Sequence, residues 1–172
     1  MRGLNVGGKN RMAMTDLTRM FVEAGCTDVR TYIQSGNVFF TASQSKLEKL
    51  PAAISKNIAE SFGFKIPVVL RTADELGETI ERNPFLKAGA AADELHVYFL
   101  AAAPDARKIA GLDPARSAPD AFCVRGRDVY LQMPNGMGRT KLTNAYFDSK
   151  LATISTARNW RTILKLFELM QK

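Results

Sequence analysis

The order of strand and helix patterns over residues 1–71 narrows the choice of fold more than any other feature of this chain. Apolar residues that alternate along the sequence predict strands, and apolar residues spaced three and four apart predict helices. The expected elements are a strand at 1–4, a helix at 15–24, a hairpin at 28–42, a helix at 51–63 and a strand at 65–71. This order, β-α-β-β-α-β, is the ferredoxin-like pattern and predicts an α+β fold.

Cap residues set the expected bounds of the two helices. Thr15 is the expected N-cap of the first helix, and Gly25 is its expected stop. Pro51 prefers the first position of a helix, so we begin the second helix there and end it at Gly63. The residues expected to face the core are Leu17, Met20, Phe21, Ala24, Ile54, Ile58 and Phe62.

The last strand of this pattern contains Pro67, which has no backbone N–H to donate, so we expect an edge strand there. A ferredoxin-like sheet places its last strand at an edge but needs a complete first strand at its centre. Only residues 1–4 are available for that central strand. We therefore expect either that residues upstream of Met1 were lost or that a neighbouring segment takes the place of the strand.

The second half of the chain predicts a related unit. The expected domains are 1–83, which ends in a connecting helix at 73–83, and 94–172, joined by a linker at 84–93. The second domain has the expected order β-α-β-β-α-α, with a strand at 95–100, a helix at 105–112, hairpin strands at 122–124 and 129–133, a helix at 140–150 and a final helix from 159. The whole chain is thus predicted to be two linked ferredoxin-like units, the first lacking most of its first strand.

The composition is typical of a soluble globular protein. The chain has 172 residues, 46% of them apolar and 24% charged, and no apolar run approaches the roughly 18 residues of a spanning helix. No signal-peptide pattern follows Met1, so we expect a cytoplasmic protein without membrane contact. Cys26 and Cys123 have no partner pattern, which argues against a zinc site or a disulfide framework.

The net charge of +7 is concentrated at the two ends of the sequence. Residues 1–30 carry a net +2, residues 31–124 a net −1 and residues 125–172 a net +6. Such asymmetry favours an anionic partner. The alternative is a generally basic surface that keeps the protein soluble.

Two loops, at 5–11 and 134–144, combine glycines with cations. Glycines allow backbone N–H groups to converge on a ligand, and a helix N-terminus adds partial positive charge. In the second loop, Arg139 and Lys141 are suited to closing on a phosphate or carboxylate from the side. Each loop alone is also explained as a glycine turn with solvated cations. Neither contains a Walker sequence or a Gly-x-Gly-x-x-Gly sequence.

Few residues are candidates for catalysis. His96 is the only histidine, and its place between Leu95 and Val97 indicates a structural position on one face of a strand. A Ser-His-Asp or Cys-His mechanism is therefore not expected, and neither a metal site nor a cofactor is predicted. Arginine, lysine, asparagine and backbone groups remain, which suit binding of anions better than hydrolysis.

Tyr32 and Phe39 are expected on the face of the 28–42 hairpin opposite Ile33, Val38 and Phe40. An RNA-recognition motif carries its base-stacking rings on such an open sheet face. The strand lacks the Lys/Arg-Gly-aromatic opening of that motif. Burial of both rings by the second domain is the alternative.

Five motifs together resemble the domain-of-unknown-function family numbered 1697, a family of uncharacterised, mainly bacterial proteins. They are Arg-Gly-Leu-Asn-Val-Gly-Gly-Lys-Asn at 2–10, Tyr-Ile-Gln-Ser-Gly-Asn-Val at 32–38, Asn-Pro-Phe at 83–85, Pro-Asn-Gly-Met-Gly-Arg-Thr-Lys-Leu-Thr-Asn at 134–144 and Thr-Ala-Arg-Asn-Trp-Arg-Thr at 156–162. The resemblance covers essentially the whole chain and implies an α+β protein with a ferredoxin-like first part, but no activity. Members usually have apolar residues before the first motif, and their lack here points to a truncated first strand.

The loop and motif positions give one set of candidate ligand-binding residues, and no catalytic residue is among them. The set is Arg2, Asn5, Gly7, Gly8, Lys9, Gln34, Ser35, Asn37, Gly136, Gly138, Arg139, Lys141, Asn144, Arg158 and Asn159. We predict an anion-binding cleft where the two glycine loops and the start of the final helix meet, with the cations on phosphate and the amides on a base, sugar or amide. The leading function is binding of a phosphorylated, nucleotide-like small molecule. Single-stranded nucleic-acid binding and a metal-independent enzyme acting on a phosphorylated substrate are the alternatives.

Overall fold

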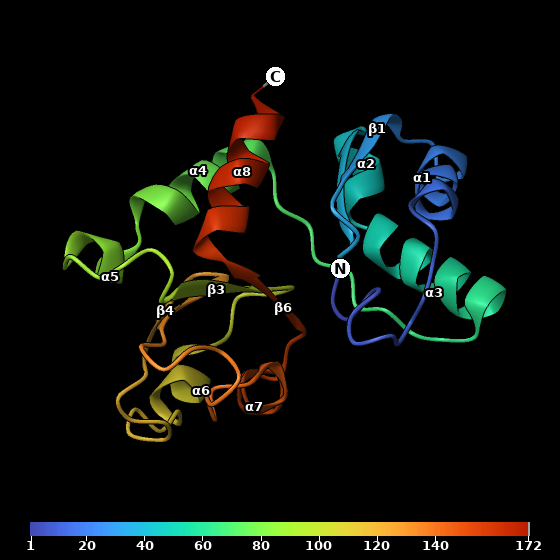
Figure 1. Ribbon diagram of the computed structural model, residues 1–172. Coiled ribbons are helices and arrows are strands. Elements are labelled where there is room, and N and C mark those ends of the chain that lie inside the picture. The colour runs from blue at the N-terminus through green and yellow to red at the C-terminus, as the bar shows by residue number, and fades with distance from the viewer. Residues whose placement is uncertain (172) are drawn as a thin grey trace. The chain divides into compact units, whose positions relative to one another are not determined.

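The computed structural model describes residues 1–171 and has a mixed α+β fold with two small antiparallel sheets (Figure 1). The chain divides into two compact units, Met1–Leu70 and Arg71–Lys172. The boundary lies earlier in the chain than the linker expected at 84–93. Residues 84–87 of that segment form a short helix.

The first unit contains the expected helix, hairpin and second helix. Its elements are α1 (Met14–Glu23), β1 (Thr27–Tyr32), β2 (Asn37–Thr41), α2 (Gln44–Leu47) and α3 (Leu50–Phe62). Gly63 ends α3 in the left-handed conformation, with φ of 76°, as its sequence position predicts. Thr15 is not the N-cap of α1, because the helix begins at Met14 and Ala13 precedes it without a side-chain cap.

Helices α1 and α3 pack their apolar stripes against one face of the β1–β2 hairpin. The core includes Leu17, Phe21, Ile54 and Ile58, all nearly inaccessible to solvent. Val38 and Phe40 pack against this core from β2. Ile33 does not join them as expected, because its φ of 48° turns the chain out of the strand and leaves the side chain 52% exposed. A positive φ is unfavourable for a β-branched residue.

The two strands expected at 1–4 and 65–71 do not form ladders. The segments run beside each other for one backbone hydrogen bond, from the Arg2 N–H to the Pro67 carbonyl (3.1 Å). Met1, Leu4, Ile66 and Val68 are nevertheless buried, and the alternation predicted for 65–71 is present at Ile66 and Val68 without the sheet. The sheet of this unit therefore has two strands, in the order β1-β2.

The second unit holds a four-stranded antiparallel sheet in the order β4-β5-β3-β6. Its elements are α4 (Ala73–Glu81), α5 (Pro84–Lys87), β3 (Leu95–Leu100), α6 (Ala106–Ala110), β4 (Ala121–Arg125), β5 (Asp128–Gln132), α7 (Asn144–Leu151), β6 (Ser155–Asn159) and α8 (Trp160–Met170). The sequence prediction missed β6, so the expected order β-α-β-β-α-α was wrong. The strand is short and polar, and its pairing with β3 is what defines it.

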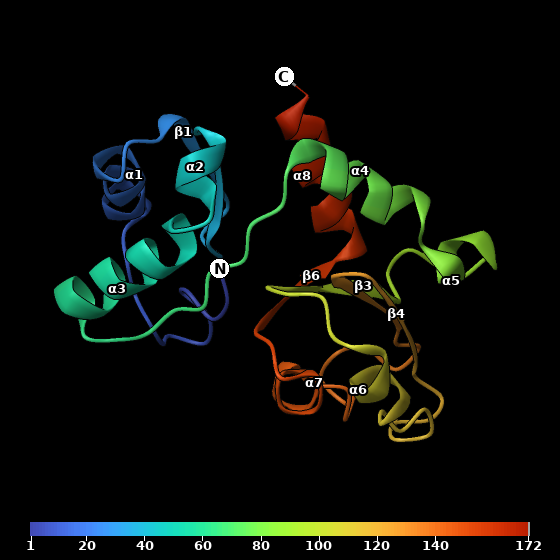
Figure 2. The same cartoon turned by 180° about the vertical axis from the view of Figure 1, so that it is seen from behind.

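Helices cover both faces of this sheet (Figure 1, Figure 2). Helices α6 and α7 lie on one face, over a core that contains Tyr98, Leu131 and Phe147. Helices α4 and α8 lie on the other face, where Trp160 and Ile163 are buried. Gly77 of α4 lets that helix approach α8 closely, because a Cβ there would lie 3.2 Å from the ring of Phe167.

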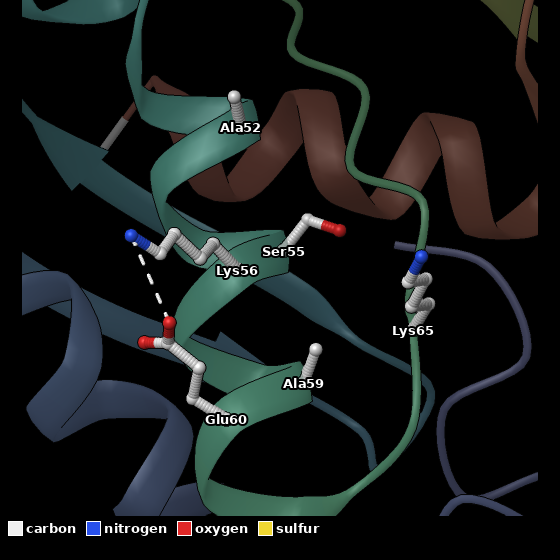
Figure 3. Close-up of a pocket in the computed structure, with 6 residues that line it drawn as sticks. All are labelled: Ala52, Ser55, Lys56, Ala59, Glu60 and Lys65. Atoms are coloured by element: carbon white, nitrogen blue, oxygen red, sulfur yellow. Dashed lines mark ion pairs between the residues drawn. The ribbon is translucent and has the colours of Figure 1, made fainter.

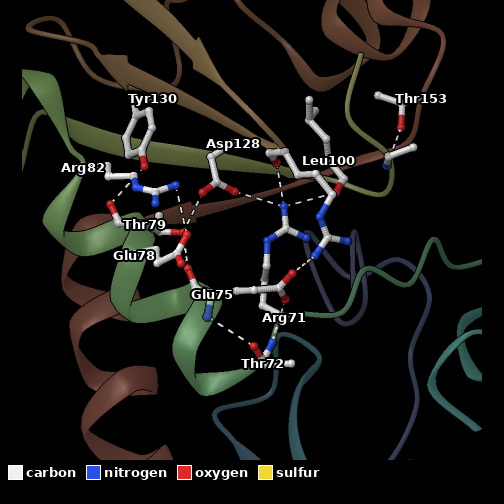
Figure 4. Close-up of polar contacts among 12 residues, drawn as sticks. Arg71, Thr72, Glu75, Glu78, Thr79, Arg82, Leu100, Asp128, Tyr130 and Thr153 are labelled. Atoms are coloured by element: carbon white, nitrogen blue, oxygen red, sulfur yellow. Dashed lines mark hydrogen bonds and ion pairs between the residues drawn. The ribbon is translucent and has the colours of Figure 1, made fainter. Parts of the chain in front are cut away.

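A buried polar network joins α4 to the β4–β5 hairpin (Figure 4). Arg71 donates to Asp128 Oδ1 (3.0 Å) and to the Leu100 and Arg127 carbonyls (3.1 and 2.6 Å). The other carboxylate oxygen of Asp128 accepts a hydrogen bond from the Thr79 hydroxyl (2.6 Å). Burial lowers the pKa of Arg71, and the neighbouring Asp128 opposes that shift. The pair is satisfied within the fold, so it positions the hairpin rather than a ligand.

Candidate functional site

The first glycine loop, at 5–11, is closed by the side chain of Asn5. The Asn5 amide donates to the Met12 carbonyl (2.9 Å) and to the Gln34 carbonyl (3.0 Å). Its oxygen accepts the Met12 N–H (2.8 Å). Both amide hydrogens are therefore used inside the protein, and ligand recognition by Asn5 stays a prediction that would require these bonds to be exchanged.

The tip of this loop points into solvent. Gly7 and Gly8 have φ values of 58° and 74°, and a Cβ at either position would meet no atom within 4 Å. The glycines are thus required by the backbone conformation, not by close packing. Lys9 is exposed, and its N–H closes the tip on the Val6 carbonyl (3.1 Å). The tip offers a cation but no convergent set of donors.

The 34–37 turn carries the other predicted residues of the first unit. Asn37 is buried and donates to the Tyr32 carbonyl and to the Ser35 hydroxyl, both at 3.2 Å, so both residues stabilise the turn. Gln34 is exposed, and it meets Asn5 only through its backbone carbonyl. Arg2 is half-buried beside Pro67. The side chain of Asn5 therefore links the 5–11 loop to the 34–37 turn, through its hydrogen bond to the Gln34 carbonyl.

The second glycine loop is open to solvent over its whole first part. Residues 134–139 are exposed, and Gly136 adopts a φ of 77°. Gly136 donates to the Met133 carbonyl (3.0 Å), and Arg139 donates to the Gly136 carbonyl (3.4 Å). Among residues 1–171, no acceptor meets the N–H groups of Met137 and Gly138. The loop therefore presents free backbone donors, as the glycine pattern predicts.

A neighbouring segment braces the end of this loop. The Ser117 hydroxyl accepts the Lys141 N–H (2.9 Å) and donates to Asp120 (2.8 Å). The Tyr98 hydroxyl donates to the Leu142 carbonyl (2.9 Å), and burial raises the pKa of this tyrosine to about 12. The loop thus begins with exposed glycines and ends on hydrogen bonds to Ser117 and to Tyr98 of β3.

Arg116 is the side chain that the sequence prediction missed at this site. Its Nε donates to the Lys141 carbonyl (3.1 Å), and its guanidinium carbon lies 4.1 Å from the centre of the Tyr146 ring. Among the described residues, no carboxylate forms an ion pair with Arg116, Arg139 or Lys141. The sequence signal was weak, because Arg116 is a single cation between the apolar segments of a loop.

The remaining predicted residues of the second unit have structural roles. Asn144 donates to Ser155 (2.7 Å) and ties the start of α7 to β6. Asn159 is the N-cap of α8 and accepts the Thr162 N–H (2.8 Å). Arg158 donates to Thr156 (3.0 Å) and to the Ala157 carbonyl (2.7 Å), and burial lowers its pKa to about 10. Asn144 Nδ2 and Asn159 Oδ1 are thus used within the fold, and ligand recognition by these residues stays a prediction.

The structure also has a shallow depression on the outer side of α3 (Figure 3). It is lined by Ala52, Ser55, Lys56, Ala59, Glu60 and Lys65. Lys56 pairs with Glu60 at 3.7 Å, and both side chains are largely exposed. This depression is open to solvent, its lining carries Lys56 and Lys65 against the single carboxylate of Glu60, and neither glycine loop contributes to it.

Within residues 1–171, no three His, Cys, Asp or Glu side chains are grouped closely enough to hold a metal ion. His96 lies on β3, and burial lowers its pKa. Its Nδ1 is buried and has no hydrogen-bond partner among the described residues. In the same part of the chain, no helix is long and apolar enough to cross a membrane.

Comparisons with known proteins agree with this picture of the fold. A family model described as "Protein of unknown function (DUF1697)" matches residues 1–130. Among solved structures, the conserved bacterial protein SP0830 from Streptococcus pneumoniae is similar, with a TM-score of 0.75 and 20% identity. The similarity covers 99% of this chain and 95% of that chain. It shows a shared fold alone. No curated protein matches the chain.

Proposed function

Because the chain belongs to the family of unknown function DUF1697, whose name specifies no activity, we propose a function from the geometry of its second unit. We propose that this unit binds a phosphorylated or otherwise anionic small ligand. The proposed anion site consists of the exposed 134–141 loop and Arg116. The observation that carries the proposal is a guanidinium that is held in place without a carboxylate partner.

Two contacts restrict the position of Arg116. The bond from Nε to the Lys141 carbonyl fixes one edge of the guanidinium, and the Tyr146 ring supports its face. The two terminal nitrogens remain available, and a guanidinium presents such nitrogens in the geometry that a phosphate or carboxylate accepts. A cation that is ordered before binding loses less conformational entropy when the ligand arrives.

The loop supplies the other groups of the proposed site. Arg139 and Lys141 are exposed cations on the same loop, and Met137 and Gly138 have free N–H groups. Backbone N–H groups beside cations are a common way of binding phosphate oxygens. Of the amides expected to recognise a base or sugar, those of Asn5, Asn37, Asn144 and Asn159 bond to atoms of the fold, so the proposed recognition is chiefly of the anionic group.

A thermal-shift experiment on the whole chain tests this proposal. The probes are inorganic phosphate, mononucleotides, sugar phosphates and coenzyme A. A ligand at 100 times its Kd should add roughly 2.7 kcal/mol of stability. We expect Arg116→Ala and Arg139→Ala to lose most of this gain. Arg161→Ala removes the same charge from the exposed face of α8 and should leave the gain unchanged.

Equal losses in all three variants would indicate only general charge attraction and would contradict the site. The absence of a shift with every probe would do the same. Turnover of a bound probe by the unmodified chain would replace simple binding with the enzyme alternative. That reaction would be metal-independent if it persisted in excess chelator.

A second candidate function is single-stranded nucleic-acid binding by the first unit. The observation that favours it is the β1–β2 face opposite the core, where Arg30 pairs in register with Phe39 and Tyr32 follows two residues later. Neither ring belongs to the core of that unit. Aromatic rings beside a cation stack on bases. Phe39→Ala should weaken oligonucleotide binding. The affinity for an oligonucleotide should also fall steeply as the salt concentration rises, whereas the affinity for a single phosphate in a pocket falls only slightly.

We also propose, for the architecture, that both units follow a ferredoxin-like plan. Two features of the second unit support this plan. From β3 to β6 its elements follow one another in the order β-α-β-β-α-β, and its strands form an antiparallel sheet in the order β4-β5-β3-β6. In the first unit only the central hairpin and its two helices follow the plan. An experimental structure with a regular ladder at 1–4 and 65–70 would extend the plan to both units, and its lack would restrict it to the second.

A further inference from the structure

The outer edge of β4 is an unpaired row of backbone groups. In the order β4-β5-β3-β6, β4 has a neighbour on one side only. Among residues 1–171, no hydrogen bond reaches the outer side of Ala121–Arg125. An exposed strand edge is a template for a further strand, and soluble proteins usually protect it.

Hydrogen bonds elsewhere in the sheet show which β4 residues face outward. Leu100 donates to the Arg127 carbonyl (2.8 Å) and Met133 donates to the Glu94 carbonyl (2.9 Å). Both bonds join the β5 side of the sheet to β3, so odd-numbered residues of β5 direct their backbone groups toward β3. In an antiparallel ladder the even-numbered ones then face β4.

The even-numbered residues of β5 pair with alternate residues of β4. Their partners are Arg125, Cys123 and Ala121, which therefore direct their backbone groups inward. Phe122 and Val124 direct theirs to the free edge. An added strand can form hydrogen bonds only if the residues opposite Phe122 and Val124 direct their own backbone groups toward β4.

The other edge of the same sheet is protected. Strand β6 carries Arg158, whose charged side chain is held against the sheet by bonds to Thr156 and Ala157. An inward-pointing charge on an edge strand disfavours pairing with another chain. Strand β4 has no proline, no lysine and no break in its register with β5. The two edges are therefore different, and only β4 is suited to pairing.

We propose that β4 pairs with β4 of a second copy of this chain, antiparallel and across a two-fold axis through Cys123. In this register Phe122 lies opposite Val124 of the second copy. The backbone groups of both residues point to the free edge, so the two residues form a hydrogen-bonded pair. Cys123 lies opposite Cys123 of the second copy as a non-hydrogen-bonded pair. The strand is thus complementary to itself, as a two-fold interface requires, and the two sheets become one.

The side chains agree with this register. Aromatic and β-branched residues are favourable cross-strand partners, as in the Phe122 and Val124 pair. Arg125 lies opposite Ala121 of the second copy, not opposite its own equivalent. The strand's single charged residue is thereby kept away from its copy, which matters for a chain with net charge +7.

Two variants at one position test the register. Ala121→Lys places a cation opposite Arg125 twice in the dimer, and Ala121→Glu places an anion there. Both change the same half-buried edge residue, so each controls for the effect of the other on folding. In sedimentation equilibrium we expect the wild-type chain to dimerise. Ala121→Lys should weaken the dimer roughly two- to thirty-fold, and Ala121→Glu should strengthen it.

A thiol oxidant supplies a second readout. Directly opposed residues of antiparallel strands have Cα atoms about 4.5 Å apart, within disulfide range. Two Cys123 thiols should therefore lose two protons and two electrons to the oxidant and join the copies covalently. Cys123→Ser should abolish the crosslink, and buried Cys26 should not replace it. A monomer at all concentrations, or a dimer indifferent to the charge at position 121, would overturn the proposal.

Discussion

Arg71 and Arg116 have similar surroundings but different partners. Each guanidinium lies over an aromatic ring, Arg71 at 5.1 Å from the centre of Phe99 and Arg116 at 4.1 Å from that of Tyr146. Arg71 also donates to two backbone carbonyls, and Arg116 donates to one. Arg71 is 8% exposed and paired with Asp128, whereas Arg116 is exposed and has no carboxylate. A buried, paired cation stabilises the fold, and an ordered, unpaired one is available to a ligand.

The largest expected effect is the loss of the buried pair. Asp128→Ala leaves the Arg71 charge buried without its partner, so we expect the free energy of unfolding of the second unit to fall by about 3–5 kcal/mol. Urea denaturation measures this change. Glu78→Ala is the control, because it removes the exposed carboxylate that pairs with Arg82 and should cost about 0.5 kcal/mol or less. Similar losses in both variants would remove the distinction between paired and unpaired arginines.

Asn5 extends the comparison to an amide that was expected to bind a ligand. Asn5→Gly keeps a residue that tolerates φ of 54° but removes the bonds to Met12 and Gln34. We expect the first unit to lose about 1–3 kcal/mol and the Met12 amide to exchange faster with deuterium. Ligand-induced thermal shifts should not change. A stable variant that loses ligand binding would restore Asn5 to the ligand site.

His96 tests whether a buried titratable group whose Nδ1 has no hydrogen-bond partner among the described residues behaves as burial predicts. Its folded-state pKa lies below the usual value near 6.5 because burial disfavours the imidazolium. The unfolded chain therefore binds the proton first as the pH falls. Stability should be fully present above pH 6.5 and decline below it, by at most about 1.4 kcal/mol per pH unit. Denaturation of the wild type and of His96→Gln at pH 7.5 and 5.5 checks this, and an equal decline in both would contradict it.

The smallest expected effect on stability is that of Arg116 itself. Removing an exposed cation from an aromatic ring costs about 0.5–1 kcal/mol, so Arg116→Ala should fold almost normally. Arg116→Lys keeps the charge but lacks the planar group that stacks and bonds through Nε. We expect both variants to lose ligand-dependent stabilisation in the thermal-shift assay. Full binding by Arg116→Lys would show that charge alone is sufficient.

Much of the local structure could be predicted from sequence, because the signals are local. Apolar periodicity predicted the buried Leu17, Met20 and Phe21 of α1 and the buried Ile54 and Ile58 of α3, and Gly63 marked the end of α3. Strand β3 has the bounds expected from the sequence, 95–100. These elements depend on the period of their own side chains, which is present in a short stretch of sequence.

The candidate site was less predictable. The glycines and cations that the pattern singled out in the 134–141 loop are exposed, whereas Asn5, Asn37, Asn144 and Asn159 bond to backbone or side-chain atoms of the fold. An asparagine in a motif has the same chemistry whether it caps a helix or binds a ligand. Only the neighbouring atoms distinguish the two.

By itself, the sequence determined the α+β character, the principal helices and hairpins, the basic charge and the two glycine loops. The tertiary structure decided that β6 completes the second sheet, that residues 1–4 form no ladder, and that Arg116 stands beside Lys141. These features depend on pairing between distant segments. Strand pairing and the burial of charge depend on partners far away in the chain, so the periodicity of a short stretch of sequence does not predict them.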